Sequence, residues 1–351
     1  MQKRVLMLTL AAASVAAIAV ACGGSSSTTS TPSGGSQTTS QATTAPYVAG
    51  PNDVVAVKKS PAALKADDPA WSSAKATTIT TTVIPGSATK AGNTVQMQAL
   101  YSDTDVWFKY TWADSTQSLV GNWTFDGTKW TNDAGQQDRL GMMWQIAPIT
   151  DFATKGCFAV CHNPSTDPFN QWYMISPKGQ TADLWQWTAK SSNAMNQMGD
   201  YTLIDTLNPP TSLGSTFVTD PYTGGGSFTN KNAAGTAPEF MQSTTVAKPT
   251  RTDAIVLQEA VLLDPTKFKA GDKVPNTIVA PYQGDRGDVD AVGTWSNNQW
   301  TVVAHRKLDT GNTDDVKFTV GGSFPFGLGL WDAAGNADHT VTDHAYNLVL
   351  K

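Results

Sequence analysis

Two cysteines and a histidine that lie close together are the residues of this chain best suited to redox chemistry. Cys157 and Cys161 are separated by three residues, and His162 directly follows the second cysteine. Two thiols can form thioethers with the vinyl groups of a haem, and an adjacent imidazole can ligate its iron. The usual spacing has two intervening residues, so the pattern predicts a covalently bound haem c in an unusual attachment segment.

Other uses of this cysteine pair fit its spacing less well. The chain contains three cysteines, and a disulfide between Cys157 and Cys161 would close a very small loop with little effect on stability. A free, reactive thiol pair leaves the adjacent His162 unexplained. Covalent haem attachment, with His162 as the proximal iron ligand, is therefore the favoured interpretation.

The N-terminal residues have the features of an export signal. Lys3 and Arg4 precede an apolar run over residues 5–20, which is too short and too unevenly flanked for a typical membrane span. Small residues lead to Cys22, as in a bacterial lipobox. Residues 1–21 are therefore expected to be a lipoprotein signal peptide, with Cys22 as the lipidated residue. The alternative is a signal peptide cleaved elsewhere, with Cys22 incidental.

Residues 22–46 are expected to form a flexible tether. After Cys22 they consist of Gly, Ser, Thr, Gln, Ala and Pro, which cannot bury a core. The haem-binding domain is therefore expected over residues 47–351, exported from the cytoplasm and held at a membrane by lipid. Gly23 lacks the aspartate that retains lipoproteins at the inner membrane. This favours the outer membrane, on its periplasmic side or at the cell surface.

The overall composition indicates a globular domain and excludes one class of partner. The 351 residues are 40% hydrophobic, enough for a sizeable core, and carry a formal net charge of −5. An acidic chain of this kind lacks the basic face that phosphate contacts with nucleic acid require. The sequence also contains no grouping of nucleophile, general base and orienting acid that stands out. It thus predicts neither a nucleic-acid-binding protein nor an enzyme.

Short strands with intervening turns account for much of the chain after residue 54. Residues 106–112 alternate so that aromatic side chains lie on both faces of one strand. Asp126-Gly127 and Asn297-Asn298 have the residue types of tight hairpin turns. The predicted fold class is all-β, an antiparallel β-sandwich. Further strands are predicted over 97–102, 316–320, 324–331 and 345–350, and a long irregular insertion that covers the haem over 164–249.

Several segments resemble the haem-binding domain of the ethylbenzene dehydrogenase γ-subunit family, relatives of which serve dimethylsulfide dehydrogenase and chlorate reductase. They are 112–116, 137–144, the attachment segment 156–162, 183–187, and 287–289 with Trp295 and Trp300. The resemblance spans residues 54–350 and implies a sandwich similar to carbohydrate-binding modules. It also implies a haem protein that transfers electrons.

The resemblance suggests residues for the sixth coordination position of the iron. Family members hold haem with a methionine, which corresponds to Met143, and with a lysine in a loop that corresponds to residues 331–339. That loop contains no lysine here, and His339 is its strongest ligand. His162 and His339 are therefore the expected iron ligands, with Met143 as the alternative to His339. Gln186 stands where members with the attachment motif often carry a histidine, so that position cannot ligate iron.

These observations together predict a membrane-tethered c-type cytochrome with one covalent haem that passes single electrons. Family analogy alone suggests a molybdenum oxidoreductase or another cytochrome as the redox partner. One alternative is a haem-free sandwich module that binds glycan or protein, with Trp107, Trp185 and Trp187 as aromatic platforms. A haem enzyme or gas sensor is a further alternative, and it requires an open position on the iron.

Overall fold

The described part of the chain forms one compact unit that begins at Val48. The computed structural model describes residues 47–87, 91–119, 121–133, 135–160, 179–204, 217–246, 251–335 and 338–351. All but the first of these residues belong to the unit Val48–Lys351. In these ranges, no helix has the length and apolar character needed to cross a membrane. Cys22, Cys161 and His162 lie outside the described residues.

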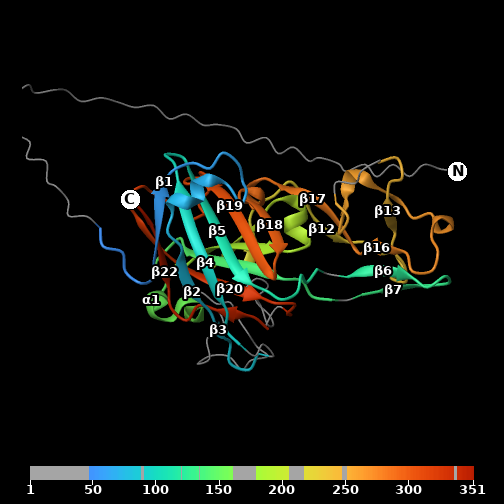
Figure 1. Ribbon diagram of the computed structural model, residues 1–351, viewed down its shortest axis with the longest axis horizontal. Helices are drawn as coiled ribbons and strands as arrows, with labels where there is room; N and C mark the ends of the chain where they lie inside the picture. The colour runs from blue at the N-terminus through green and yellow to red at the C-terminus, as the bar shows by residue number, and fades with distance from the viewer. Residues whose placement is uncertain are drawn as a thin grey trace, which may run out of the picture. The chain divides into compact units, whose positions relative to one another are not determined.

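A 14-stranded sheet makes up most of this unit (Figure 1). Eleven of its strands follow one another as hydrogen-bonded neighbours, in the order β11 (Phe217–Thr219), β10 (Gly199–Leu203), β9 (Ala182–Thr188), β8 (Arg139–Gln145), β20 (Ser323–Trp331), β22 (Tyr346–Leu350), β1 (Asp53–Lys58), β4 (Thr94–Tyr101), β5 (Asp105–Ala113), β19 (Gln299–Lys307) and β18 (Asp290–Ser296). Three short strands pair beside this row: β2 (Thr77–Thr80), β3 (Thr82–Val83) and β21 (Thr340–Val341).

Strand β1 joins the two halves of the sandwich. Its first residues pair with β22 and its last two pair with β4, both in parallel, whereas the neighbouring pairs along the row are antiparallel. One buried cluster contains side chains from both halves, including Phe108 and Trp300 from one and Trp144 and Leu328 from the other. The predicted all-β sandwich is therefore confirmed, with a shared parallel strand that the sequence did not indicate.

Strand β5 shows why the two halves pack face to face. Val106, Phe108, Tyr110 and Trp112 are buried, and the residues between them are only partly buried. This alternation follows from the two-residue period of a strand, which places one row of side chains in the core. The prediction for residues 106–112 is confirmed.

Both predicted hairpin turns are present. Asn297 and Asn298 have φ angles of 53° and 57° and connect β18 to β19, as a turn with two left-handed residues requires. The turn between β6 (Asn122–Phe125) and β7 (Trp130–Asn132) contains Gly127 at φ 104°. Asp126 Oδ1 accepts hydrogen bonds from the backbone amides of Thr128 and Lys129, which fixes this turn.

Smaller elements extend from the main sheet. The remaining strands form three small sheets: β12 (Gly224–Thr229) with β17 (Thr277–Gln283) and β14 (Ile255–Val256); β13 (Phe240–Gln242) with β15 (Ala260–Leu262); and β16 (Lys273–Pro275) with β6 and β7. The described helices are short: α1 (Phe152–Lys155) and α2 (Ser191–Met195), with 3₁₀ turns η1 (Pro69–Ser73), η2 (Gly156–Ala159), η4 (Leu257–Glu259), η5 (Pro265–Lys267) and η6 (Asp285–Gly287).

Two sequence-based predictions need correction. Residues 316–320 do not form a strand, because the backbone of Val316 bonds to side chains: its amide donates to Asp183 and its carbonyl accepts from Arg306. The section 164–249 is more regular than expected. Strands β9 and β10 from this section extend the main sheet, and β9 pairs with β8 along seven residues. Residues 164–178, 205–216 and 247–249 of this section lie outside the described residues.

Candidate functional site

The outer face of strands β8 and β20 carries the candidate ligand residues. Leu140, Met142 and Trp144 of β8 point into the central core, so Gly141 and Met143 point to the opposite face. Met143 is 4% exposed and packs in a second cluster with Phe152, Val160 and other residues that cover this face. Met142 and Met143 therefore lie on opposite faces of β8.

The turn η2 places Cys157 directly over this face. A Cβ atom at Gly327 of β20 would lie 2.6 Å from the Sγ atom of Cys157. Gly327 is also the cross-strand partner of Met143. Since partners in an antiparallel pair point to the same face, Cys157 and Met143 lie on the same side of the sheet.

Gly156 permits this close approach of the attachment segment. Its φ angle is 52°, and a Cβ atom here would lie 2.7 Å from the carbonyl oxygens of both Thr342 and His344. The backbone amide of Cys157 donates to the carbonyl of Thr342 over 3.3 Å. The segment is therefore held against the residues that precede β22.

Cys157 is a buried thiol in apolar surroundings. Its side chain is 5% exposed and packs with Ile84 and Val341. Burial raises the pKa of this thiol to about 11, so the thiol is neutral at physiological pH. Its Sγ atom lies 3.9 Å from the hydroxyl of Thr342. A thiol in this setting is not an activated nucleophile.

His339 lies further along the same face. Its ring stacks on Trp331 with 4.0 Å between the ring centroids and 16° between the planes. The Trp331 ring in turn lies 3.1 Å from the position of a Cβ on Gly141 and 3.3 Å from that on Gly329. His339 is 6% exposed. His339 is therefore not an exposed loop histidine, because Trp331 covers its ring.

A row of glycines connects these residues. Gly327 and Gly329 of β20 and Gly141 of β8 leave a floor without side chains, which is covered by Cys157 at one end and by Trp331 and His339 at the other. Gly327 and Gly329 are two residues apart, roughly 7 Å along the strand. The candidate residues Cys157 and Met143 thus share one sheet face with His339, which is remote from them in sequence.

A pocket adjoins the glycine row on the side of β9 and β10. Its volume is about 350 Å³, and its lining includes Arg139, Gln186, Thr188, Tyr201 and Arg286. Gln186 is the cross-strand partner of Gly141, so the pocket and the glycine floor meet at this pair. Neither arginine was predicted from the sequence as a site residue. The alternation of β8 could have indicated Arg139, since it is four residues before Met143 and therefore on the same face.

Arg286 is held by three tyrosines. The guanidinium carbon lies 4.2 Å from the ring centre of Tyr282, 5.0 Å from that of Tyr222 and 5.2 Å from that of Tyr201. Such cation–π contacts fix the orientation of the guanidinium group. Two arginines in a polar pocket are suited to binding carboxylate or phosphate groups.

The tryptophans proposed as glycan platforms are not available for that role. Trp185 and Trp187 are 1% and 0% exposed and belong to the central core, because their positions on β9 point inward. Trp107 lies on the outer face of β5 and stacks on His305 with 5.1 Å between the ring centroids. The prediction of an aromatic platform is therefore wrong for Trp185 and Trp187.

The fold and this site together define a β-sandwich domain with a ligand-sized pocket on one outer face. A model of the ethylbenzene dehydrogenase family matches residues 68–345, which is most of the sequence, and the chain belongs to this family. A search of curated proteins gave no match to the sequence.

Among solved structures, similar chains include carbohydrate-binding proteins. One is a carbohydrate-binding module of family 9 from Caldicellulosiruptor kristjanssonii in complex with glucose, with 9% identity, a TM-score of 0.33, and coverage of 85% of this chain and 95% of that one. Another is a putative carbohydrate-binding protein from Bacteroides uniformis, with 6% identity, a TM-score of 0.36, and coverage of 85% and 90%. Similarity at this level carries no information about the ligand of this chain.

Proposed function

We propose that this protein is a membrane-tethered c-type cytochrome that transfers single electrons outside the cytoplasm. The observation that carries the proposal is the convergence of Cys157, Met143 and His339 on one sheet face above a row of glycines. Cys157 was selected by the attachment motif, and Met143 and His339 were selected by the family resemblance. Haem would supply the one-electron chemistry, because none of the described side chains is a redox centre.

The residues of the face fit a covalently bound haem in three respects. Cys157 offers a thiol that is already buried against the floor. The glycines let the thiol of Cys157 and the stacked rings of Trp331 and His339 lie close to the sheet, which brings a candidate attachment residue and a candidate ligand to one face. Arg139 and Arg286 line the adjoining pocket, where guanidinium groups can bind the propionate carboxylates.

In this proposal, His162 is one axial ligand of the iron and His339 is the other, with Met143 as the alternative to His339. Both candidates for the second position are nearly fully buried, which suits a ligand protected from water. Met143 packs with Val160, two residues before His162, whereas His339 is held by Trp331. The protein would bury the haem and set its potential, and would need no catalytic groups of its own.

The cellular setting forms part of the same proposal. Residues 1–21 would direct export, Cys22 would carry the lipid, and residues 22–46 would link it to the domain 47–351 at the outer membrane. Membership of the ethylbenzene dehydrogenase family supports association with an oxidoreductase complex. A molybdenum oxidoreductase or another cytochrome is the proposed electron-transfer partner.

Covalent haem content tests this proposal directly. The full chain is produced in a host that attaches haem to exported proteins, and denatured protein is stained for haem on a gel. We expect one haem per chain, reduced attachment in Cys157→Ser and Cys161→Ser, and wild-type attachment in Cys22→Ser, a matched cysteine outside the motif. A haem-free wild-type protein under these conditions would contradict the proposal.

A haem-free binding module is the second candidate function. The polar pocket with Tyr201, Tyr222 and Tyr282 in its lining favours it, because hydroxyl groups and aromatic rings together suit a sugar. The two candidates are separated by titrating oligosaccharides into the purified, haem-free protein. Saturable binding that is lost in Tyr282→Ala, together with absence of haem in the mature protein, would support the binding module.

A further inference from the structure

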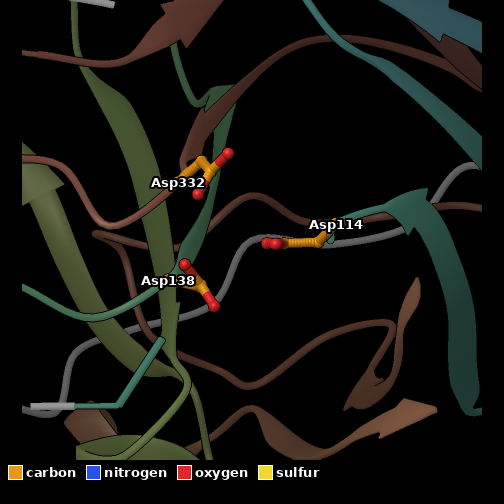
Figure 2. A group of neighbouring side chains, drawn as sticks. All are labelled: Asp114, Asp138 and Asp332. Carbon is orange, nitrogen blue, oxygen red and sulfur yellow. The ribbon is translucent and has the colours of Figure 1, made fainter. Parts of the chain in front are cut away.

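Three aspartates from distant segments of the chain lie close together in space. Asp114 follows β5, Asp138 precedes β8, and Asp332 follows β20. One carboxylate oxygen from each lies within 4.8 Å of the other two. Figure 2 shows the carboxylate of Asp114 pointing toward the side chains of Asp138 and Asp332. The cluster therefore joins both halves of the sandwich.

The carboxylate of Asp138 is fully buried and accepts hydrogen bonds from three donors. Its Oδ1 atom accepts from the amide of Ala333 over 3.0 Å. Its Oδ2 atom accepts from the amide of Ser118 over 2.7 Å and from the indole of Trp300 over 3.0 Å. An ionised carboxylate has about four acceptor sites. Asp138 can therefore accept one further contact, on Oδ1.

Asp114 has a buried oxygen without a hydrogen-bond donor. The residue is 5% exposed, and its Oδ1 atom accepts from the amide of Thr116 over 3.0 Å. Its Oδ2 atom is buried and has no hydrogen-bond partner. An unsatisfied buried oxygen of this kind is costly, by about 1–3 kcal/mol or more for a charged group. The carboxylate that carries this oxygen points toward Asp138 and Asp332 (Figure 2).

The charge of the cluster is not balanced by a basic side chain. In the described ranges, no Lys, Arg or His forms an ion pair with these three aspartates. The second aspartate cluster of the chain is different, since Arg306 lies 2.7 Å from Asp183 and 3.5 Å from Asp315. Burial and the charges of Asp138 and Asp332 raise the pKa of Asp114 to about 6, and a bound cation would relieve this repulsion.

We propose that Asp114, Asp138 and Asp332 form a binding site for a divalent cation, and that its ion is Ca²⁺. Because the three oxygens are no more than 4.8 Å from one another, a cation placed between them can lie within about 2.8 Å of all three. Calcium binds oxygen at roughly 2.3–2.6 Å and tolerates irregular geometry, whereas magnesium requires a near-ideal octahedron at about 2.1 Å. Small side-chain movements suffice for calcium. Asp332 is exposed, so water can complete the coordination.

The site would anchor the loop that carries His339. Asp332 and Ala333 begin this loop, and Ala333 already donates to Asp138. A cation would attach the same loop to β5 and β8 through Asp114 and Asp138. The proposal does not depend on haem, since none of the three aspartates is among the proposed haem ligands.

Calcium binding to the full chain, after removal of metal with EDTA, tests the site. Trp295 donates its indole N–H to the carbonyl of Asp114 over 3.1 Å, and Trp300 donates to Asp138. Both indoles are therefore close enough to sensitise the luminescence of Tb³⁺, a calcium analogue. We expect one Tb³⁺ per chain, with sensitised emission that Ca²⁺ displaces. Calorimetry with Ca²⁺ then gives the affinity without a fluorescent probe.

Two variants probe the site and two serve as controls. Asp332→Asn changes an exposed side chain and leaves the fold intact, and Asp114→Asn keeps an oxygen that can accept from Thr116. Each is expected to weaken Ca²⁺ binding at least about tenfold, because calcium affinity depends on ligand charge. Asp103→Asn, at an exposed carboxylate, and Asp200→Asn, in the second cluster, should bind as wild type. Absence of Ca²⁺ binding, or unchanged affinity in both Asp332→Asn and Asp114→Asn, would overturn the proposal.

Discussion

The Sγ atom of Cys157 lies where the side chain of any larger residue at position 327 would have to be. A Cβ atom at Gly327 would be 2.6 Å from this sulfur, a distance at which one of the two must move. Gly327 is also the cross-strand partner of Met143. The first cysteine of the attachment motif is therefore packed against the strand pair that carries a candidate iron ligand.

This relationship predicts that Gly327→Ala disturbs the attachment segment. The added methyl group displaces Cys157, and we expect a loss of about 1–3 kcal/mol in the free energy of unfolding, as is typical of overpacking. The fraction of chains with covalent haem should fall as well. Urea unfolding and haem staining measure the two effects. Gly135→Ala is the matched control, because the nearest atom to its Cβ is 3.6 Å away. If Gly327→Ala were as stable as wild type, Cys157 would not depend on the space left by the absent side chain at residue 327.

A second prediction concerns the sixth ligand of the iron. If His339 ligates, His339→Met replaces an imidazole by a thioether, which favours reduced iron and raises the potential, on the order of 100 mV. Met143→Leu then leaves the potential nearly unchanged. Redox titration with absorption spectra measures both variants. A large spectral change in Met143→Leu, with none in His339→Met, would instead identify Met143 as the ligand.

A third prediction concerns Arg286 in the pocket. A cation near the haem stabilises the reduced state, which carries one less positive charge. Arg286→Gln should therefore lower the reduction potential, by an amount on the order of tens of millivolts. Arg251→Gln is the control, since Arg251 pairs with Asp253 away from the pocket. Equal potentials for Arg286→Gln and wild type would place the propionates elsewhere.

A fourth prediction concerns the pH dependence of stability. Burial and the neighbouring charges of Asp183 and other aspartates raise the pKa of Asp220 to about 7, and the residue is 1% exposed. Its pKa in the unfolded chain is about 3.9. Between these values the folded state binds more protons than the unfolded state. The contribution of Asp220 to stability is therefore complete below about pH 4 and is lost as the pH rises toward 7.

Asp220→Asn removes this titration while keeping an oxygen that accepts from Thr202. The unfolding free energy of the variant minus that of wild type should be larger at pH 8 than at pH 5. We expect this increase to be on the order of 1–3 kcal/mol. Urea unfolding at the two pH values measures the difference. Asp103→Asn, at an exposed carboxylate, should show no such gain. A variant with the same pH slope as wild type would mean that Asp220 titrates normally.

Some strands and turns could be predicted from the sequence because they depend on local residue patterns. The alternation of residues 106–112 and the two asparagines at 297 and 298 correctly predicted β5 and its neighbouring hairpin. The pairing of β1 in parallel with β22 and β4 depends on contacts between distant segments. Residues 316–320 were misassigned, since the backbone of Val316 bonds to the side chains of Asp183 and Arg306 in place of a neighbouring strand.

The candidate site was predictable in part for similar reasons. Motif and resemblance selected Cys157, Met143 and His339, which the fold places on one face. The glycine row was not indicated, because it depends on the register between β8 and β20. The stacking of His339 on Trp331 was not indicated either, because it depends on the path of the loop after β20. Arg286 enters the pocket from a turn remote in sequence from Arg139, so only the tertiary fold brings the two arginines together.

The absorption spectrum of the mature protein, recorded during a redox titration, tests the central claim most directly. A c-type cytochrome with two axial ligands is expected to give the spectrum of a six-coordinate, low-spin haem and one reversible one-electron transition. The haem should remain with the chain after denaturation. A five-coordinate, high-spin spectrum would indicate a haem enzyme or sensor, and a protein without haem absorption would contradict the account.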